Sequence, residues 1–254
     1  MMDEFAWTAF DRESTKTPSI ERPSQNQVHL YCLEFAPYLE AVSRLSEWLS
    51  EEERQRAARL RFADGRDRFI LSHAYTRFVL ARYLGIHPRD VEFGTSETGK
   101  PWVVGESGGM EERFGFNLSH CKTYVVVAVA PTLLVGVDVE EHRPNMDALG
   151  IAKRYFAPEE FAVFETLAEE EIEPYFLKIW TCKEAFVKAI GLGLSYSLNR
   201  FQAIGLQDNR PELIGIEPDY GPSSAWSLRT CRPAQEVHIA IAVRLPNAAI
   251  VQCG

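Results

Sequence analysis

The sequence predicts an α+β protein of two similar lobes, each a small antiparallel sheet packed with helices. Helical spacing of apolar residues runs over 39–84 and again over 174–190, and a glycine follows each segment (Gly85 and Gly191). Segments 124–130 (YVVVAVA) and 237–243 (VHIAIAV) are typical of strands. These elements recur in the same order in both halves of the chain, which indicates an internal duplication with a boundary near residue 135.

We expect three regions along the chain. Residues 1–26 are polar and predict a loose extension, residues 27–135 form the N-terminal lobe, and residues 136–254 form the C-terminal lobe. Short strands are also expected at 28–35, 91–93, 102–104, 133–139, 201–204 and 226–229, with a loop over 105–115 and a helix that Pro158 opens at its first turn.

Composition excludes several classes of protein. The chain has 254 residues, 46% of them hydrophobic, and its net charge of −9 disfavours a general nucleic-acid binder. Neither a secretory leader nor an apolar run long enough for a membrane helix is recognisable, so no membrane association is expected. The five cysteines are scattered without a Cys-x-x-Cys pair, which favours a reducing cytoplasm over disulfides or a zinc site.

Basic residues gather in one segment of this acidic chain. Acidic residues are interspersed among them, so a solvated helix face and a surface for phosphates or an acidic partner are both open. The arginines of this segment are Arg54, Arg56, Arg59, Arg61, Arg66 and Arg68.

The segment GVDVE (136–140) places two carboxylates at the end of an apolar strand. Residues i and i+2 of a strand share a face, so Asp138 and Glu140 project together while the valines face the core. Two neighbouring carboxylates repel each other, and a hard cation such as Mg²⁺ relieves that repulsion. The alternative is an ordinary solvent-facing strand end.

The segment WTCKEAFVK (180–188) predicts a helix with one charged stripe. Glu184 and Lys188 stand four residues apart, in the order that favours an ion pair on a helix surface. Lys183 lies close to the apolar stripe, so its ammonium either extends past that stripe to water or reaches a buried anion. A pyrophosphate would supply such an anion.

Two further segments carry candidate phosphate contacts. In FNLSHC (116–121), Ser119 and His120 precede the buried strand, where they either donate to a phosphate or form a local turn. Cys121 is not expected to act with His120, because neighbours on a strand face opposite ways. In TGKP (98–101), Lys100 stands at the tip of a turn, where it either meets an anion or is merely solvated.

These four segments together resemble the Sfp-type 4'-phosphopantetheinyl transferases. The resemblance covers about residues 50–245, and the segments follow one another in the order found in that family. It implies a fold of two lobes related by a pseudo-twofold axis, with coenzyme A bound between them. It further implies transfer of 4'-phosphopantetheine from coenzyme A to a serine of an acyl, peptidyl or polyketide carrier protein, with release of 3',5'-ADP.

The resemblance also implies roles for individual residues. Mg²⁺ is held by Asp138, Glu140 and Glu184, and Glu184 or a water that it orients is the candidate general base. The expected contacts to coenzyme A, some of them shared with the metal or with catalysis, are Arg56, Arg68, Lys100, Ser119, His120, Asp138, Lys183 and Lys188. Arg54 remains an alternative to Arg56, because the segment does not align without gaps.

Two other functions remain open from the sequence. A magnesium-dependent nucleotide pyrophosphohydrolase would use the same carboxylates with no protein acceptor. A non-catalytic protein that binds coenzyme A or a carrier would share the fold, although the intact acidic residues and Lys188 disfavour it. Because a duplicated chain builds a cleft between its own lobes, we expect a monomer.

Overall fold

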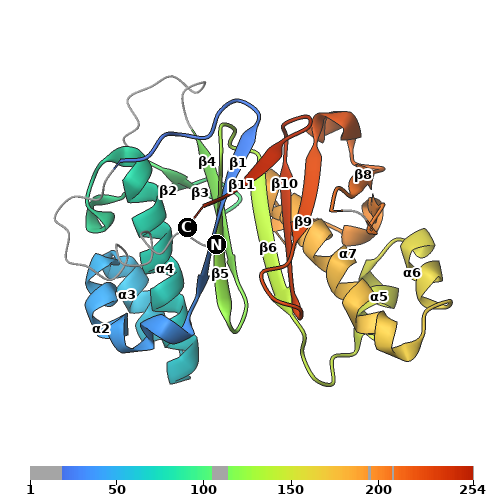
Figure 1. Ribbon diagram of the computed structural model, residues 1–254, viewed down its shortest axis with the longest axis horizontal. Helices are drawn as coiled ribbons and strands as arrows, with labels where there is room; N and C mark the ends of the chain where they lie inside the picture. Colours follow the sequence, from blue (N-terminus) through green and yellow to red (C-terminus); the bar gives the residue numbers. More distant parts are fainter. Residues whose placement is uncertain (1–18, 105–113, 194–195, 208, 254) are drawn as a thin grey trace.

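The computed structural model describes residues 19–104, 114–193, 196–207 and 209–253. Most of the predicted extension and of the predicted 105–115 loop therefore lies outside the described residues. Figure 1 shows four layers: helices, two sheets face to face in the middle, and helices again on the far side. None of the described helices combines the length and the apolar character needed to cross a bilayer.

The first half of the chain alternates short helices and strands around one long helix. Its 3-10 turns are η1 (Ala36–Ala41), η2 (Ser46–Trp48) and η3 (Pro88–Asp90). Its helices and strands are β1 (Gln27–Glu34), α2 (Val42–Leu45), α3 (Glu51–Ala58), α4 (Ala63–Leu84), β2 (Phe93–Thr95), β3 (Pro101–Val103), β4 (Gly115–His120) and β5 (Tyr124–Ala130).

The second half has the same kinds of element around a second long helix. Its 3-10 turns are η6 (Leu198–Arg200), η7 (Pro218–Tyr220) and η8 (Ser223–Ala225). Its helices and strands are β6 (Val135–Glu141), α5 (Ala148–Tyr155), α6 (Pro158–Phe164), α7 (Glu169–Ile190), β7 (Gln202–Ile204), β8 (Glu212–Ile214), β9 (Ser227–Cys231), β10 (Val237–Val243) and β11 (Ala249–Cys253).

The two central sheets are four and three strands wide. The first has the order β11-β1-β5-β4 and the second the order β6-β10-β9. All pairings in these two sheets are antiparallel except β1 with β11, which is parallel and joins Gln27 to Ala249. The last strand of the predicted C-terminal lobe thus belongs to the first sheet, which the sequence did not predict. The predicted α+β class is confirmed, whereas a pseudo-twofold axis remains a prediction.

Aliphatic side chains fill the space between the two sheets. Strand alternation turns Leu30 and Val126 of the first sheet toward Val137, Ile239 and Ile241 of the second, and all five are buried. The opposite face of each sheet packs on its own long helix, α4 on the first and α7 on the second. Strands of both halves therefore share the apolar cluster between the two sheets, and separate clusters lie under the helices on either side.

Two predicted helices have different limits in the structure. The single helical segment expected over 39–84 is divided into α2, α3 and α4, because the capping box of Ser50 with Glu53 begins a new helix at Glu51. The helix expected from Pro174 begins earlier, at Glu169. Three glutamates in its first turn complement the helix dipole, and Glu171 Oε2 accepts from Ala168 N at 3.0 Å.

Candidate active site

A glycine brings β6 and α7 into close contact. A Cβ atom at Gly136 would lie 2.1 Å from the Ala185 carbonyl oxygen and 2.4 Å from Ala189 N, so only glycine fits there. The helix backbone therefore rests directly on the strand at the first residue of the GVDVE segment. As a result, Asp138 of β6 lies beside Lys188 of α7.

Asp138 is the centre of a small polar cluster. It is 4% exposed, and its Oδ1 accepts from Lys188 Nζ at 2.6 Å and from Ser119 Oγ at 2.9 Å. Lys188 Nζ also donates to Ser119 Oγ at 2.9 Å, which closes a triangle between β4, β6 and α7. The structure thus brings together three of the predicted site residues, from segments up to 69 positions apart.

Two carboxylate oxygens beside this triangle have no hydrogen-bond partner. Within the described residues, Asp138 Oδ2 and Glu184 Oε1 are buried side-chain oxygens that nothing in the protein satisfies. Burial raises the pKa of Glu184, and the charge of Asp138 raises it further. A buried unpaired carboxylate oxygen is costly, so this arrangement suits a bound cation or a proton.

Glu140 stands next to this pair but is engaged elsewhere. Its Oε2 accepts from Arg143 at 2.6 Å, and Arg143 is 61% exposed. Burial and the neighbouring Asp138 raise the pKa of Glu140 to about 7, against the opposing charges of Arg143 and Lys188. No three acidic, histidine or cysteine side chains in the described ranges form a ready-made metal cluster. Convergence of the three predicted carboxylates on one ion therefore stays a prediction.

Strand β4 separates this cluster from a cavity. Asn117 and Ser119 face β6, where Asn117 Oδ1 accepts from Val137 N at 2.9 Å. The alternate residues Phe116 and Leu118 line a cavity of about 780 Å³, and His120 continues their row at the strand end. Of the two alternatives for this segment, the local turn is not found, because the segment is a strand that presents one face to each side.

Arg56 of α3 and His73 of α4 line the same cavity, and further basic and aromatic side chains lie beside them. Arg56 lies over the ring of Phe69, 5.5 Å from its centroid, and His73 stacks on the same ring at 4.0 Å. Arg68 pairs with Asp64 at 3.2 Å, and both Arg68 and His73 lower the pKa of His120, after the larger effect of burial. Lys188 also lowers the pKa of His120, so Arg68, His73 and Lys188 all lie close enough to His120 to influence its protonation.

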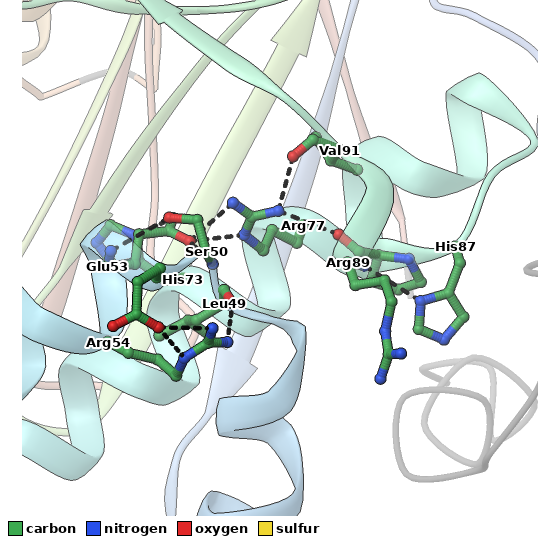
Figure 2. A network of polar contacts seen from close by, with 11 residues as sticks. Leu49, Ser50, Glu53, Arg54, His73, Arg77, His87, Arg89 and Val91 are labelled. Carbon is green, nitrogen blue, oxygen red and sulfur yellow. Dashed lines mark hydrogen bonds and ion pairs between the residues drawn. The ribbon is translucent and has the colours of Figure 1, made fainter.

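His73 was not predicted from the sequence. Its Nδ1 lies 2.8 Å from Glu53 Oε1, and Glu53 Oε2 in turn accepts from Arg77, as Figure 2 shows. The sequence does contain an indication of this pair, because Glu53 immediately precedes the arginine-rich segment 54–68 and His73 follows it. Their separation of 20 residues, across a break between two helices, concealed the pair.

Lys183, predicted as a contact to coenzyme A, is instead part of the interior. It is wholly buried, and its ammonium pairs with Glu160 at 2.8 Å and donates to the Leu198 and Phe201 carbonyls. Of the two alternatives for Lys183, the structure shows the buried anion, which is the Glu160 carboxylate, and the assignment of Lys183 to a substrate phosphate is corrected.

Lys100 is likewise not free at the tip of its turn. Its Nζ donates to the carbonyls of Leu133 at 2.7 Å, Val135 at 2.9 Å and Ala189 at 2.6 Å. Its ammonium is engaged with the protein main chain, and a contact of Lys100 with coenzyme A stays a prediction.

Comparison with known proteins assigns the family. The profile described as "4'-phosphopantetheinyl transferase, N-terminal" matches residues 34–132, and that of the 4'-phosphopantetheinyl transferase superfamily matches residues 134–242.

Individual proteins agree with these profiles. The chain is 34% identical to 4'-phosphopantetheinyl transferase HetI of Nostoc sp., over 86% of this chain and 88% of that protein. It is 30% identical to 4'-phosphopantetheinyl transferase Sfp of Bacillus subtilis, over 71% and 76% of the two chains. It is 26% identical to the human L-aminoadipate-semialdehyde dehydrogenase-phosphopantetheinyl transferase, over 80% and 71%. The chain therefore belongs to the 4'-phosphopantetheinyl transferase superfamily.

Proposed function

We propose that this enzyme transfers 4'-phosphopantetheine from coenzyme A to a serine of an acyl, peptidyl or polyketide carrier protein, with Mg²⁺ as its metal. The observation that carries the proposal is the pair of unpartnered oxygens, Asp138 Oδ2 and Glu184 Oε1, beside the ammonium of Lys188. Carboxylates next to a lysine are the donors that hold a magnesium diphosphate.

Two of the three carboxylates are available to bind Mg²⁺ as they stand, and the third must first give up an ion pair. Asp138 and Glu184 offer oxygens that no hydrogen bond occupies. Glu140 joins them by exchanging its contact with Arg143, a surface ion pair of the kind that contributes little free energy. Mg²⁺ bound by these three residues supplies positive charge to the diphosphate of coenzyme A.

The chain's own residues orient and neutralise the remaining charge. Lys188 and His120 contact the diphosphate, and Ser119 fixes Asp138 from the opposite strand. Arg56 on the cavity wall, together with Arg68 of α4, binds the 3'-phosphate end of coenzyme A, and the cavity of about 780 Å³ holds the nucleoside. These assignments place the nucleotide on the α3 and α4 side and the reacting phosphorus near Asp138.

The reaction needs an acceptor for one proton. The carrier's serine oxygen forms a bond to the phosphorus that bears pantetheine, and the bond from that phosphorus to the bridging oxygen breaks to release 3',5'-ADP. The serine proton passes to Glu184 or to a water that Glu184 orients. Burial raises the pKa of Glu184, which makes it a better base than an exposed carboxylate.

The last part of the proposal concerns the compartment and the oligomeric state of the protein. We propose a cytoplasmic monomer, since all five cysteines are free and the strands and helix that carry the acidic cluster come from one chain.

The test is incubation with coenzyme A, Mg²⁺ and a panel of unmodified carrier proteins, read by intact mass. The proposal requires a mass gain of one phosphopantetheine on a carrier serine, and omission of Mg²⁺ abolishes it. Consumption of coenzyme A without any carrier would identify a pyrophosphohydrolase instead. Binding of coenzyme A with no transfer to any carrier would identify a non-catalytic protein.

A further inference from the structure

The turn between β2 and β3 is fixed by its own hydrogen bonds. Ser96 Oγ accepts from Lys100 N at 2.9 Å, the Ser96 carbonyl accepts from Gly99 N at 2.9 Å, and Ser96 N donates to the Lys100 carbonyl at 2.9 Å. Gly99 has φ +88°, a conformation that favours glycine. The backbone of Lys100 is therefore held in one place, and only its side chain reaches out.

That side chain ends on three main-chain carbonyls from two segments of the chain. The Val135 carbonyl belongs to the first residue of β6, the Leu133 carbonyl lies two residues before that strand, and the Ala189 carbonyl lies in the last turn of α7. An ammonium has three donors, so all three are used. Burial lowers the pKa of Lys100 to about 8, so that the ammonium form still predominates at neutral pH.

The contact completes the end of α7. The last carbonyls of a helix lack partners within the helix and favour a positive charge. Gly191 caps α7 with φ +76°, and a Cβ atom there would lie 3.1 Å from Thr98 Oγ1 and 3.4 Å from Lys100 Cβ. The β2–β3 turn is thus packed on the helix end and adds a cation to its carbonyls, because the ammonium of Lys188 in the last turn pairs with Asp138.

The elements that Lys100 joins are those that carry the site. The Val135 carbonyl lies three residues before Asp138, and the Ala189 carbonyl belongs to the residue after Lys188. The turn itself contributes Gly99 and Pro101 to the wall of the 780 Å³ cavity. One side chain therefore links the cavity wall to both the strand and the helix of the acidic cluster.

We propose that Lys100 is a positioning residue, which holds Asp138 and Lys188 in register with the cavity wall and makes no contact with the phosphates of coenzyme A. The proposal rests on the proposed function, in that the site it positions is the transfer site. A displacement of about 1 Å between reacting groups costs up to roughly a hundredfold in rate. Loss of the three hydrogen bonds therefore lowers kcat without weakening any phosphate contact.

The first measurement needs no activity. Hydrogen–deuterium exchange of the Lys100→Met variant is compared with that of the unaltered protein and of Lys122→Met, which removes an exposed lysine from the β4–β5 turn. The amides of residues 187–191 exchange at least about tenfold faster in Lys100→Met and stay unchanged in Lys122→Met. Unchanged exchange in Lys100→Met overturns the proposal, whether or not the protein transfers phosphopantetheine.

The second measurement separates positioning from phosphate binding. For Lys100→Met, kcat falls about 10- to 100-fold, while KM changes by the same factor for coenzyme A and for 3'-dephospho-coenzyme A. A rise in KM confined to coenzyme A would show a direct contact with its 3'-phosphate and overturn the proposal. A rise in KM for both donors with kcat unchanged would place the lysine on the diphosphate and overturn it equally.

A milder variant covers the case in which Lys100→Met does not fold. Lys100→Gln retains two donors on a shorter side chain, and Lys100→Arg retains a charge whose planar group does not point three donors at one place. Both give exchange rates and kcat values between those of Lys100→Met and the unaltered protein. Values equal to the unaltered protein in Lys100→Gln contradict the need for all three hydrogen bonds.

Discussion

Two buried acidic centres in this protein differ in how their carboxylates are satisfied. Glu53, in the first turn of α3, accepts from Ser50 N, His73 Nδ1 and Arg77, each at 2.8 Å (Figure 2). Burial alone would raise its pKa, but His73, Arg77 and Ser50 together lower the pKa of Glu53 to about 2. This centre is complete without a ligand.

The acidic cluster between β6 and α7 shows the opposite pattern. Asp138 and Glu184 each keep a buried oxygen without a partner, and the pKa values of Glu184 and Glu140 are raised. Burial is similar in the two centres, with Glu53 8% and Asp138 4% exposed. Burial of an acidic residue is therefore not what distinguishes the two centres. The difference is the unsatisfied carboxylate oxygens, on which the proposed metal site rests.

The largest expected effect is on catalysis at the unsatisfied centre. Asp138→Ala and Glu184→Gln each lower kcat/KM for carrier modification by about 10³ or more, since each removes a charge that holds the metal against the diphosphate. Intact-mass kinetics measure this. Glu165→Gln, an exposed carboxylate after α6, is the matched control and keeps its activity. Near-unaltered activity of Glu184→Gln would remove Glu184 from the metal site.

The same comparison predicts an effect on folding at the satisfied centre. Glu53→Gln lowers the free energy of unfolding by about 3 kcal/mol at pH 7, because it leaves Arg77 buried without its carboxylate. Glu184→Gln, by contrast, keeps or gains stability in metal-free buffer, since it removes an unpaired buried charge. Urea unfolding of both variants checks this, and equal losses in the two would contradict the distinction between the centres.

The stability that Glu53 contributes depends on pH in a defined window. Its folded-state pKa of about 2 lies below its ordinary value of 4.5. The contribution is therefore fully present above pH 4.5 and is lost as the pH falls toward 2. The difference in unfolding free energy between the unaltered protein and Glu53→Gln narrows over that range. A difference that grows on acidification would show that the carboxylate is not the stabilising form.

The smallest effect concerns the hydroxyl that supports Asp138. Ser119→Ala removes one hydrogen bond to Asp138 Oδ1 and one acceptor for Lys188, while Lys188 still holds Asp138. A lost hydrogen bond to a charged group corresponds to roughly a tenfold fall in kcat/KM. Ser43→Ala, at an exposed serine in α2, is the control. A loss as large as that of Asp138→Ala would mean that Ser119 itself contacts the phosphates.

The sequence predicted much of the site because its geometry is local. Strand alternation placed Asp138 and Glu140 together, the spacing on α7 aligned Glu184 with Lys188, and the resemblance supplied the order of the segments. The contact between strand and helix depends on Gly136, whose role becomes visible only when Ala185 and Ala189 are seen against it.

The features that the sequence did not predict depend on partners far along the chain. Helical spacing left open whether Lys183 extends to water or reaches a buried anion, and it did not indicate that Glu160 of another helix provides that anion. A turn showed Lys100 at its tip, but not that the Ala189 carbonyl lies within reach. The parallel pairing of β11 with β1 has no short-range signal, because nothing in residues 249–253 indicates which strand they join.

The most direct test of the central claim is magnesium binding itself. Isothermal titration of Mg²⁺ into the protein with saturating coenzyme A and no carrier is compared for the unaltered protein, Glu184→Gln and Glu53→Gln. One ion per chain is predicted for the unaltered protein and for folded Glu53→Gln, with binding lost or at least tenfold weaker in Glu184→Gln. Equal affinity in Glu184→Gln and the unaltered protein would show that the unpaired carboxylates are not the metal site.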